Sequence, residues 1–165
     1  MADGVTNPPG AVAARLAGLG LSLPDVAAPV AAYVPAVRTG RYVHTSGQLP
    51  FVDGALPATG KVGEGDGLVP PDDAADLARV CALNALAAVH ALVGNLDQVV
   101  RVVKVVGFVA SDPSFTGQPG VVNGASTLLG DVFGDAGVHA RSAVGVAVLP
   151  LDAPVEVELV VELAE

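Results

Sequence analysis

The chain has 165 residues, enough for one domain with a substantial core, and 52% of them are hydrophobic. No run of residues approaches the roughly 18 uncharged apolar positions of a membrane-spanning helix, so we expect no membrane contact and burial of the apolar surplus between subunits. The net charge of −9 and the scattered positions of the eight Lys and Arg residues argue against a nucleic-acid partner, because phosphates are repelled by such a surface. A single cysteine, Cys81, excludes an internal disulfide, and no signal peptide is evident, so the expected location is cytoplasmic.

The first thirty residues are predicted to be an N-terminal extension, followed by one domain over residues 31–165. Within the extension, residues 11–19 suit a short helix. Gly20 and Pro24 then stop it, because neither residue continues a helix well.

A β-hairpin is predicted next. Residues 36–38 and 41–45 have strand-like composition and flank Thr39 and Gly40, a pair that suits a tight turn. Residues 51–71 are rich in Gly and Pro, and we expect a long loop there.

Two helices and a long strand follow. The acidic residues after Pro71 favour a helix N-terminus and Gly94 favours its end, so a helix is predicted over residues 71–93. Residues 99–110 are rich in valine and predict a strand, and residues 119–133 predict a second helix.

The last quarter of the chain predicts two strands, over residues 139–148 and 155–162, with a proline-containing turn between them. Period-2 alternation puts Arg141, Ala143 and Gly145 on one face. These small side chains form a floor beside one guanidinium and leave space for a ligand. Such a guanidinium suits a carboxylate, which it can bind with two parallel hydrogen bonds.

On the last strand, Glu156, Glu158 and Glu162 share one parity, so an acid is expected near this base. The element order predicts an α+β fold with one mixed sheet and two helices on one face. We expect the other face, together with the Arg141 floor, to form a subunit interface.

Six short stretches have a characteristic order and spacing. They are Tyr33-Val34-Pro35, Thr45-Ser46-Gly47-Gln48-Leu49-Pro50, the helix containing Asn84, Val121-Val122-Asn123, Ala140-Arg141-Ser142 with Leu149-Pro150, and Val155-Glu156-Val157-Glu158. Over roughly residues 30–163 the chain resembles the reactive-intermediate deaminase (Rid) family, also called YjgF-like or L-PSP endoribonuclease.

The resemblance implies a chorismate-mutase-like fold that assembles as a homotrimer with clefts between subunits. It also implies cofactor-free hydrolysis of enamines and imines, such as 2-aminoacrylate, to 2-keto acids and ammonia. By position, Arg141 is similar to the arginine that binds the substrate carboxylate and Glu156 to the acid beside the attacking water. The positions that match the family's pocket are Tyr33, Ser46, Gly47, Asn123 and, through its backbone, Ala143.

Two positions depart from the family pattern. Ala143 stands where a cysteine is frequent and Gly145 where a glutamate is frequent, so no covalent mechanism through residue 143 is available. Each site residue also has a structural interpretation. Arg141 could form a salt bridge, even with Glu156, and Glu156 could be a solvated strand residue. Tyr33 could serve packing alone, and Asn123 could be a helix-end residue with only a share in the pocket.

Three functions therefore remain open: deamination of small imino acids, non-catalytic sensing of a small carboxylate such as a 2-keto acid, and, with less support, ribonuclease activity. Neither a metal nor another cofactor is expected, because His44, His90 and His139 lack metal-ligand spacing with one another or with Cys81. Cys81 itself is interpreted as a small core residue.

Overall fold

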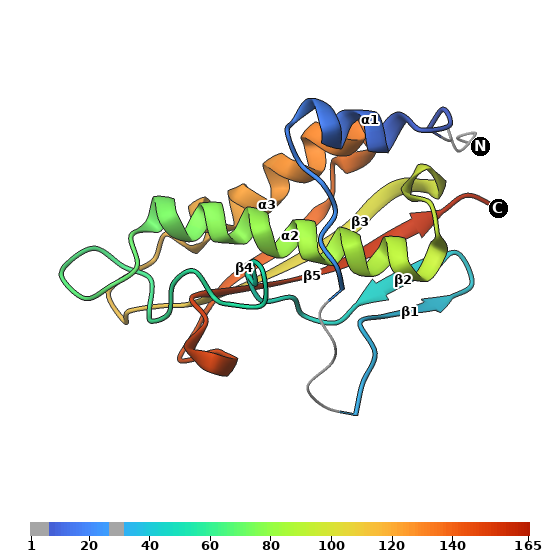
Figure 1. Cartoon of the computed structure of the whole chain (residues 1–165). Coiled ribbons are helices and arrows are strands. Elements are labelled where there is room, and N and C mark those ends of the chain that lie inside the picture. Colours follow the sequence, from blue (N-terminus) through green and yellow to red (C-terminus); the bar gives the residue numbers. More distant parts are fainter. Residues whose placement is uncertain (1–6, 27–31) are drawn as a thin grey trace.

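The structure, a computed structural model, describes residues 7–26 and 32–165. Residues 30 and 31, where the boundary between extension and domain is predicted, both lie outside the described residues. The elements in chain order are α1 (Ala11–Gly18), β1 (Ala36–Thr39), β2 (Tyr42–Thr45), α2 (Pro71–Val93), η1 (Leu96–Gln98), β3 (Val99–Ala110), α3 (Gln118–Phe133), η2 (Gly134–Gly137), β4 (Ala140–Val146), η3 (Pro150–Asp152) and β5 (Val155–Leu163). All three α-helices lie on one side of the sheet (Figure 1).

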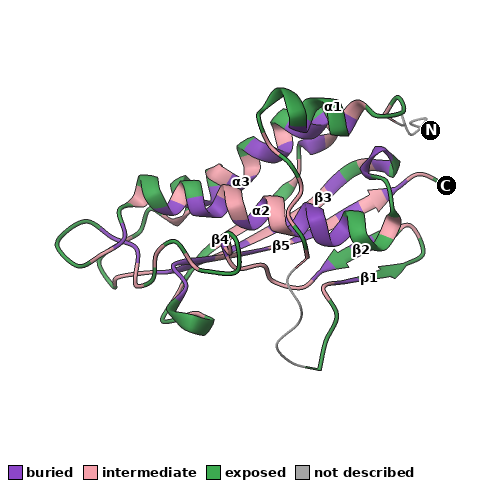
Figure 2. Cartoon of the chain, viewed as in Figure 1, coloured by how far each residue is buried: buried purple, intermediate pink, exposed green. Residues whose placement is uncertain are grey.

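One five-stranded mixed sheet, in the order β1-β2-β5-β3-β4, forms the centre of the fold. Only β3 and β4 run parallel, and α3 provides the crossover that a parallel pair requires. The other neighbouring strands are antiparallel. The predicted α+β architecture is confirmed. In the described residues, 7–26 and 32–165, no α-helix lies on the opposite face of the sheet, which we call the bare face (Figure 2).

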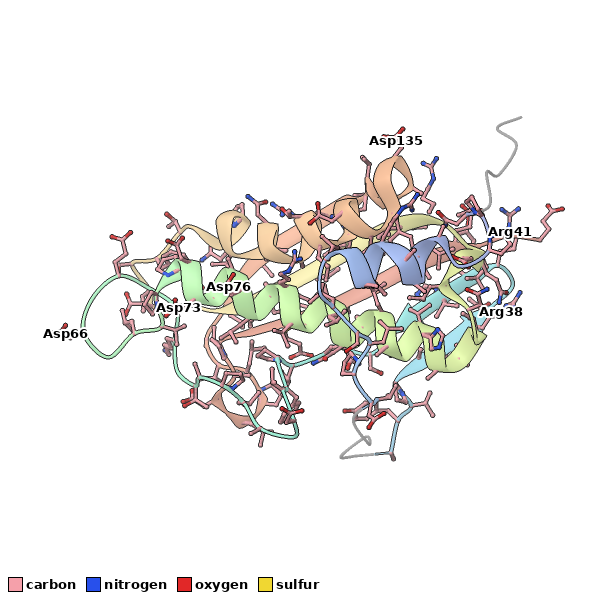
Figure 3. All side chains as sticks on the ribbon, turned by 45° about the horizontal axis from the view of Figure 1, so that its top comes forward. Arg38, Arg41, Asp66, Asp73, Asp76 and Asp135 are labelled. Atoms are coloured by element: carbon pink, nitrogen blue, oxygen red, sulfur yellow. The ribbon has the colours of Figure 1, made fainter. Side chains whose placement is uncertain are left out.

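The predicted hairpin is confirmed. Thr39 pairs with Tyr42, and Gly40 adopts a φ of 57°, a conformation that costs glycine little. Arg41, beside this turn, forms ion pairs with Glu162 at 2.8 Å and with Glu165 at 3.3 Å. Figure 3 shows Arg38 and Arg41 together at this end of the molecule. The hairpin is thereby tied to the end of β5.

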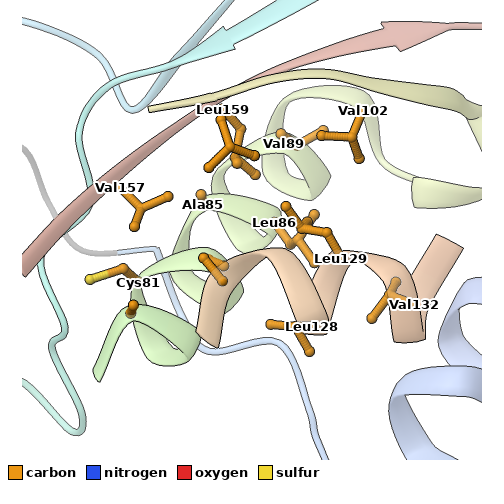
Figure 4. Packing of buried hydrophobic residues seen from close by; sticks show 14 of the residues in the cluster. Cys81, Ala85, Leu86, Val89, Val102, Leu128, Leu129, Val132, Val157 and Leu159 are labelled. Atoms are coloured by element: carbon orange, nitrogen blue, oxygen red, sulfur yellow. The ribbon is translucent and has the colours of Figure 1, made fainter. Parts of the chain in front are cut away.

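The core lies between the sheet and the two long helices, α2 and α3. Every second residue of β5 is buried, in the series Val155, Val157, Leu159, Val161 and Leu163. These side chains pack against the same cluster as the buried faces of α2 and α3 (Figure 4). Burial of each such side chain contributes about 1.5–3 kcal/mol. The alternate residues of β5, which include its three glutamates, therefore lie on the sheet face without helices.

Helix α2 is the longest helix, with 23 residues, and both predicted ends are confirmed. It begins at Pro71 after Pro70, and it ends at Gly94, whose φ of 79° forms a left-handed cap. By length and composition alone α2 could cross a membrane, but half of its most apolar window is buried inside the fold. It packs on α3 and β5, so its hydrophobic character has a structural explanation as the core helix.

Helix α1 adds a third helix to the two that were predicted on this face. It contacts α3 and η1. The buried carboxylate of Asp97 in η1 accepts hydrogen bonds from the backbone N–H groups of Gly10 (2.5 Å) and Val12 (2.9 Å) at the start of α1. Asp97 therefore caps α1 from a distant part of the chain.

Strand β4 is shorter than predicted: it ends at Val146 rather than at residue 148. Val148 is exposed, and Leu151 and Asp152 both adopt a φ of 58° in the following turn. Ala147 and Val148 therefore lie outside the ladder, between the last paired residue of β4 and this turn.

Candidate functional site

Arg141 lies near the start of β4, and its side chain points toward α3. Its Nη1 donates to Asn123 Oδ1 at 2.8 Å and to Ser126 Oγ at 3.1 Å. Its Nη2 donates to the carbonyl oxygen of Pro119 at 3.2 Å. All three acceptors belong to one helix, so α3 fixes the guanidinium.

The spacing of these acceptors explains the geometry. Pro119, Asn123 and Ser126 are related as i, i+4 and i+7, which places them along one stripe of a helix. Successive turns in the first half of α3 therefore present a carbonyl, an amide oxygen and a hydroxyl toward the strand that carries Arg141.

This arrangement leaves part of the guanidinium unoccupied. Arg141 has five N–H donors, and three of them are engaged with α3. Within residues 7–26 and 32–165, Nε–H and the second N–H of Nη2 have no acceptor. Nε and Nη2 are neighbours on one edge of the planar group, and such an edge can hold a carboxylate with two hydrogen bonds.

The predicted floor of small residues is present on the same face as Arg141, but it is partly covered. A Cβ at Gly145 would lie 2.9 Å from Gln118 Nε2 on α3, and a Cβ at Gly107 on the neighbouring strand would overlap Val122. Ala143 packs partly buried against the core. The small residues thus let α3 approach the sheet closely, and the open donors lie at the margin of this contact.

Glu156 lies on the other face of the sheet, near the start of β5. Its carboxylate occupies the space beside Gly47 that a side chain would need, since a Cβ there would overlap Oε1 and lie 2.7 Å from Cδ. Burial, and then the neighbouring carboxylate of Glu158, raise the pKa of Glu156 above its ordinary value. A side chain at position 47 would therefore displace the carboxylate of Glu156 from its present position, and the backbone of Gly47 does not have a positive φ.

The segment around Gly47 is fixed by its backbone. Gln48 and Val157 exchange two hydrogen bonds, at 2.8 and 3.1 Å, which join this segment to β5. Asn84 on α2 donates to the carbonyl oxygens of Leu49 (3.0 Å) and Phe51 (3.1 Å). The asparagine that contributed to the family resemblance thus holds the chain that follows Gly47.

Ser46 has a structural partner within the chain. Its hydroxyl donates to the carbonyl oxygen of Val34 at 2.6 Å, and its N–H donates to that of Pro35 at 2.8 Å. These bonds fasten the segment that carries Tyr33, whose side chain is 47% exposed. Gly47 therefore lies beside Glu156, and Ser46 links this place to the segment that carries Tyr33.

The predicted site residues fall into two groups. The arginine group consists of Arg141, Asn123 and Ala143, on the helix side of β4. The glutamate group consists of Glu156, Gly47, Ser46 and Tyr33, beside the start of β5.

Two expectations are wrong within one chain. Glu156 does not lie near Arg141, and the small residues beside Arg141 lie on the sheet face that the helices cover, not on the bare face. Among residues 7–26 and 32–165, Arg141 and Glu156 of one chain form no strand-end salt bridge, whereas a salt bridge at a subunit interface stays a prediction. Alternation assigns parity along β4, but the sequence of β4 does not say which parity the helices cover, because one parity carries valines and the other carries small residues and Arg141.

The family described as YjgF/chorismate mutase-like, putative endoribonuclease, matches residues 13–163. The chain belongs to the YjgF/chorismate mutase-like family. It is 48% identical over 155 residues to protein TCP17 of Trypanosoma cruzi, a match that covers 93% of this chain and 95% of that protein. The resemblance drawn from the six short stretches is confirmed.

Two solved structures extend the comparison. The protein Atu1372 of Agrobacterium tumefaciens, described as of unknown function, is 44% identical with a TM-score of 0.84, over 93% of this chain and 94% of that one. Escherichia coli TdcF, solved with bound serine, is 25% identical with a TM-score of 0.60, over 84% of this chain and 94% of that one. The fold of this YjgF-family chain is therefore shared by proteins of quite different sequence.

One residue that holds Arg141 was missed by the sequence analysis. Ser126 lies three residues after Asn123 on the same helix and accepts from the same nitrogen of Arg141. The signal was available, because residues at i and i+3 on a helix are neighbours. It could not be used without knowing that Asn123 faces Arg141.

The cysteine of this YjgF-family chain has a structural place in the core. Cys81 is fully buried, its Sγ lies 3.7 Å from the carbonyl oxygen of Val155, and burial followed by the charge of Glu156 raises the pKa of its thiol. This matches the core role predicted for it. In residues 7–26 and 32–165, no three His, Cys, Asp or Glu side chains are grouped as metal ligands.

Proposed function

We propose that this protein hydrolyses small 2-imino acids and their enamine forms, such as 2-aminoacrylate, to 2-keto acids and ammonia. One observation carries the proposal: Arg141 is held by three acceptors on α3 while two neighbouring N–H donors are left for a ligand. A preformed guanidinium fork selects a carboxylate and loses little entropy when it binds. The solved structure of TdcF with bound serine supports a small carboxylate ligand, since serine is an amino acid.

The reaction requires the protein to position the substrate and to transfer the protons of one water molecule. A water molecule adds its oxygen to the C=N carbon, the C–N bond breaks, and both protons of that water end on the departing ammonia. Arg141 holds the carboxylate so that the C=N carbon has one position. Glu156 orients the water and moves its protons, a role that suits a half-buried carboxyl whose pKa is raised toward neutrality.

The two groups require a second subunit. Since Arg141 and Glu156 lie on opposite faces of one sheet, they meet at one substrate only if each comes from a different copy of the chain. A homotrimer in which each subunit presents its helix side to the bare face of the next would form three such sites. Val144, on the bare face of β4 and 43% exposed, gives that face apolar character suited to an interface.

Complementation between two inactive variants tests this arrangement directly. Arg141→Ala and Glu156→Gln each remove one side of every site, so we expect each homotrimer to be nearly inactive in 2-keto acid release from freshly generated 2-aminoacrylate. Denatured together in equal amounts and refolded, they should regain about a quarter of the wild-type activity, because a quarter of the sites then combine two native sides. Recovery no greater than that of separately refolded variants would contradict a shared site.

The same assay separates the alternative functions. A sensor would bind pyruvate in calorimetry without accelerating ammonia release. Ribonuclease activity has less support, because Arg41 is paired with two glutamates and Asp66, Asp73 and Asp76 lie together at the opposite end of the molecule (Figure 3). RNA cleavage that persists through purification and is lost in Arg141→Ala would favour it over deamination.

A further inference from the structure

His139 immediately precedes β4 and lies in a hydrogen-bond chain that reaches Arg141. Its Nδ1 is 2.6 Å from the carbonyl oxygen of Gly137, and its Nε2 is 2.9 Å from Ser126 Oγ. Ser126 Oγ also accepts from Arg141 Nη1 at 3.1 Å. A continuous series of hydrogen bonds thus connects Gly137, His139, Ser126 and Arg141.

The chemistry of the groups fixes the direction of each bond. A carbonyl oxygen only accepts, so Nδ1 of His139 carries hydrogen and donates to Gly137. In the neutral ring Nε2 is then an acceptor, and the Ser126 hydroxyl must donate to it. The hydroxyl hydrogen is turned away from Arg141, and a lone pair of the same oxygen faces the guanidinium.

The Gly137 end of this hydrogen-bond series is fixed by packing. Gly137 is buried, and a Cβ there would overlap the carbonyl oxygen of Leu129, so its backbone lies directly against α3. Its carbonyl oxygen therefore has a fixed position relative to the helix that carries Ser126. A fixed acceptor for His139 fixes the ring, and the ring fixes the hydroxyl.

We propose that Ser126 and His139 are positioning residues that orient the guanidinium of Arg141 for a carboxylate. If the Ser126 hydroxyl were free to rotate, its hydrogen could point at Arg141 Nη1, where two donors would face each other. The tautomer of His139 prevents this, so Nη1 stays engaged with α3 and the edge formed by Nε and Nη2 stays open. This inference rests on the proposed function, because it assigns the control of that function's carboxylate site.

The Ser126–His139 pair also has the spacing of a nucleophile and its base. Its environment favours positioning instead, since the serine oxygen already accepts from Arg141 and is half-buried between α3 and β4. A serine nucleophile would be labelled by phenylmethylsulfonyl fluoride. Labelling of Ser126 in the intact protein would overturn the positioning role.

The first test requires no activity. In ¹⁵N-labelled protein, the side-chain spectrum of His139 should show the Nδ1–H tautomer, and the Nε–H signal of Arg141 should be sharp. Ser126→Ala should broaden the Arg141 signal through faster exchange, whereas Thr127→Ala, at the next and exposed position of α3, should not. An Nε2–H tautomer of His139, or an Arg141 signal that Ser126→Ala leaves unchanged, would refute the proposal.

The second test measures ligand binding and turnover. Ser126→Ala and His139→Ala should each weaken pyruvate binding about tenfold and raise KM by a similar factor with little change in kcat. Ser126→Thr, which keeps the hydroxyl, should retain most of the affinity, and His90→Ala, at an exposed position of α2, should retain all of it. If wild-type protein binds pyruvate but all of these variants bind it equally, the positioning role is wrong. If wild-type protein does not bind pyruvate at all, the proposed function fails, while the spectra still decide how Arg141 is held.

Discussion

The arginine group and the glutamate group differ in how each is completed. Within one chain Arg141 has all the partners that hold it, and only its outward edge is left for a ligand. Glu156 has a glycine on one side and another carboxylate nearby, with no cation paired to it in the part of the chain that the structure describes. Under the proposed function the first group holds a ligand still, whereas the second supplies a carboxyl whose pKa is raised by burial and by Glu158.

The largest expected effect is the loss of the arginine itself. Arg141→Ala should lower kcat/KM for 2-aminoacrylate by about 1,000-fold, because a charge-assisted pair of hydrogen bonds to the carboxylate is lost. Arg141→Lys should recover part of this activity, since an ammonium keeps the charge but not the fork. Steady-state keto-acid release is the measurement, and Arg38→Ala, on the exposed hairpin, is the control. Equal activity in the alanine variants at positions 38 and 141 would remove Arg141 from the site.

Substitution of the acid should have a different signature. Glu156→Gln should reduce kcat by about 100-fold and leave pyruvate binding nearly unchanged, because proton transfer is lost while the carboxylate site is intact. Glu64→Gln, in the exposed loop, should behave as wild type. A parallel loss of pyruvate affinity would show that the two groups do not divide binding and proton transfer as proposed.

The raised pKa of Glu156 also predicts how stability depends on pH. Between the unfolded pKa and the higher folded pKa, the native state binds more protons than the unfolded state, so the free energy of unfolding falls as pH rises through this window. Glu156→Gln stays neutral and should lack this part of the fall. Urea unfolding at a series of pH values checks it, and a variant that is less stable than wild type at pH 7 would contradict the burial argument.

A smaller effect on activity is expected at Gly47. Gly47→Ala places a methyl group where the carboxylate lies, so Glu156 must move; we expect about a tenfold loss of kcat and a destabilisation of about 1–3 kcal/mol. Gly130→Ala is a matched control, because that glycine lies in α3 and a Cβ added to it would meet nothing within 4 Å. The control should be stabilised by about 0.5–1 kcal/mol without loss of activity.

Much of the fold could be predicted because its signals are local. Gly40 and Gly94 mark turns whose positive φ the structure contains, and the alternation of β5 follows directly from its valines and glutamates. The end of β4 could not be predicted, because Val148 is apolar enough for a strand, while the left-handed turn that follows it has no comparable sequence signal.

The site could be predicted as a set of residues but not as an arrangement. Arg141 and Asn123 were both named, yet their contact depends on which face of β4 meets α3, a property of the whole fold. Gly47 and Glu156 were also both named, and their contact depends on the bridge between Gln48 and β5. Arg141 and Asn123 are 18 positions apart in the sequence, and Gly47 and Glu156 are about 110 positions apart. Contacts over such separations are set by tertiary packing, which a single sequence does not report.

The contact between α1 and Asp97 could not be predicted from the sequence either. Substitution of Asp97 has the smallest expected effect on catalysis. Burial works to raise the pKa of Asp97, but hydrogen bonds from Val12, Gly10 and Asn95 outweigh it and hold that pKa below its ordinary value. A lowered carboxyl pKa contributes stability above the unfolded pKa, and this contribution is lost as pH falls through the folded pKa. Asp97→Asn should therefore lower the free energy of unfolding at pH 7 by about 1–2 kcal/mol, because the charged acceptor for two backbone N–H groups is lost.

The same variant should have wild-type kcat and KM at 25 °C, since Asp97 contacts neither group of the site. Urea unfolding at pH 7 and pH 3 is the measurement, with Asp66→Asn in the exposed loop as the control. The stability difference between wild type and Asp97→Asn should shrink as the pH falls toward the lowered pKa of Asp97. If Asp97→Asn instead lowered turnover as Glu156→Gln does, α1 would be coupled to catalysis, and the division of the molecule into a helix side that holds and a bare face that transfers protons would have to be abandoned.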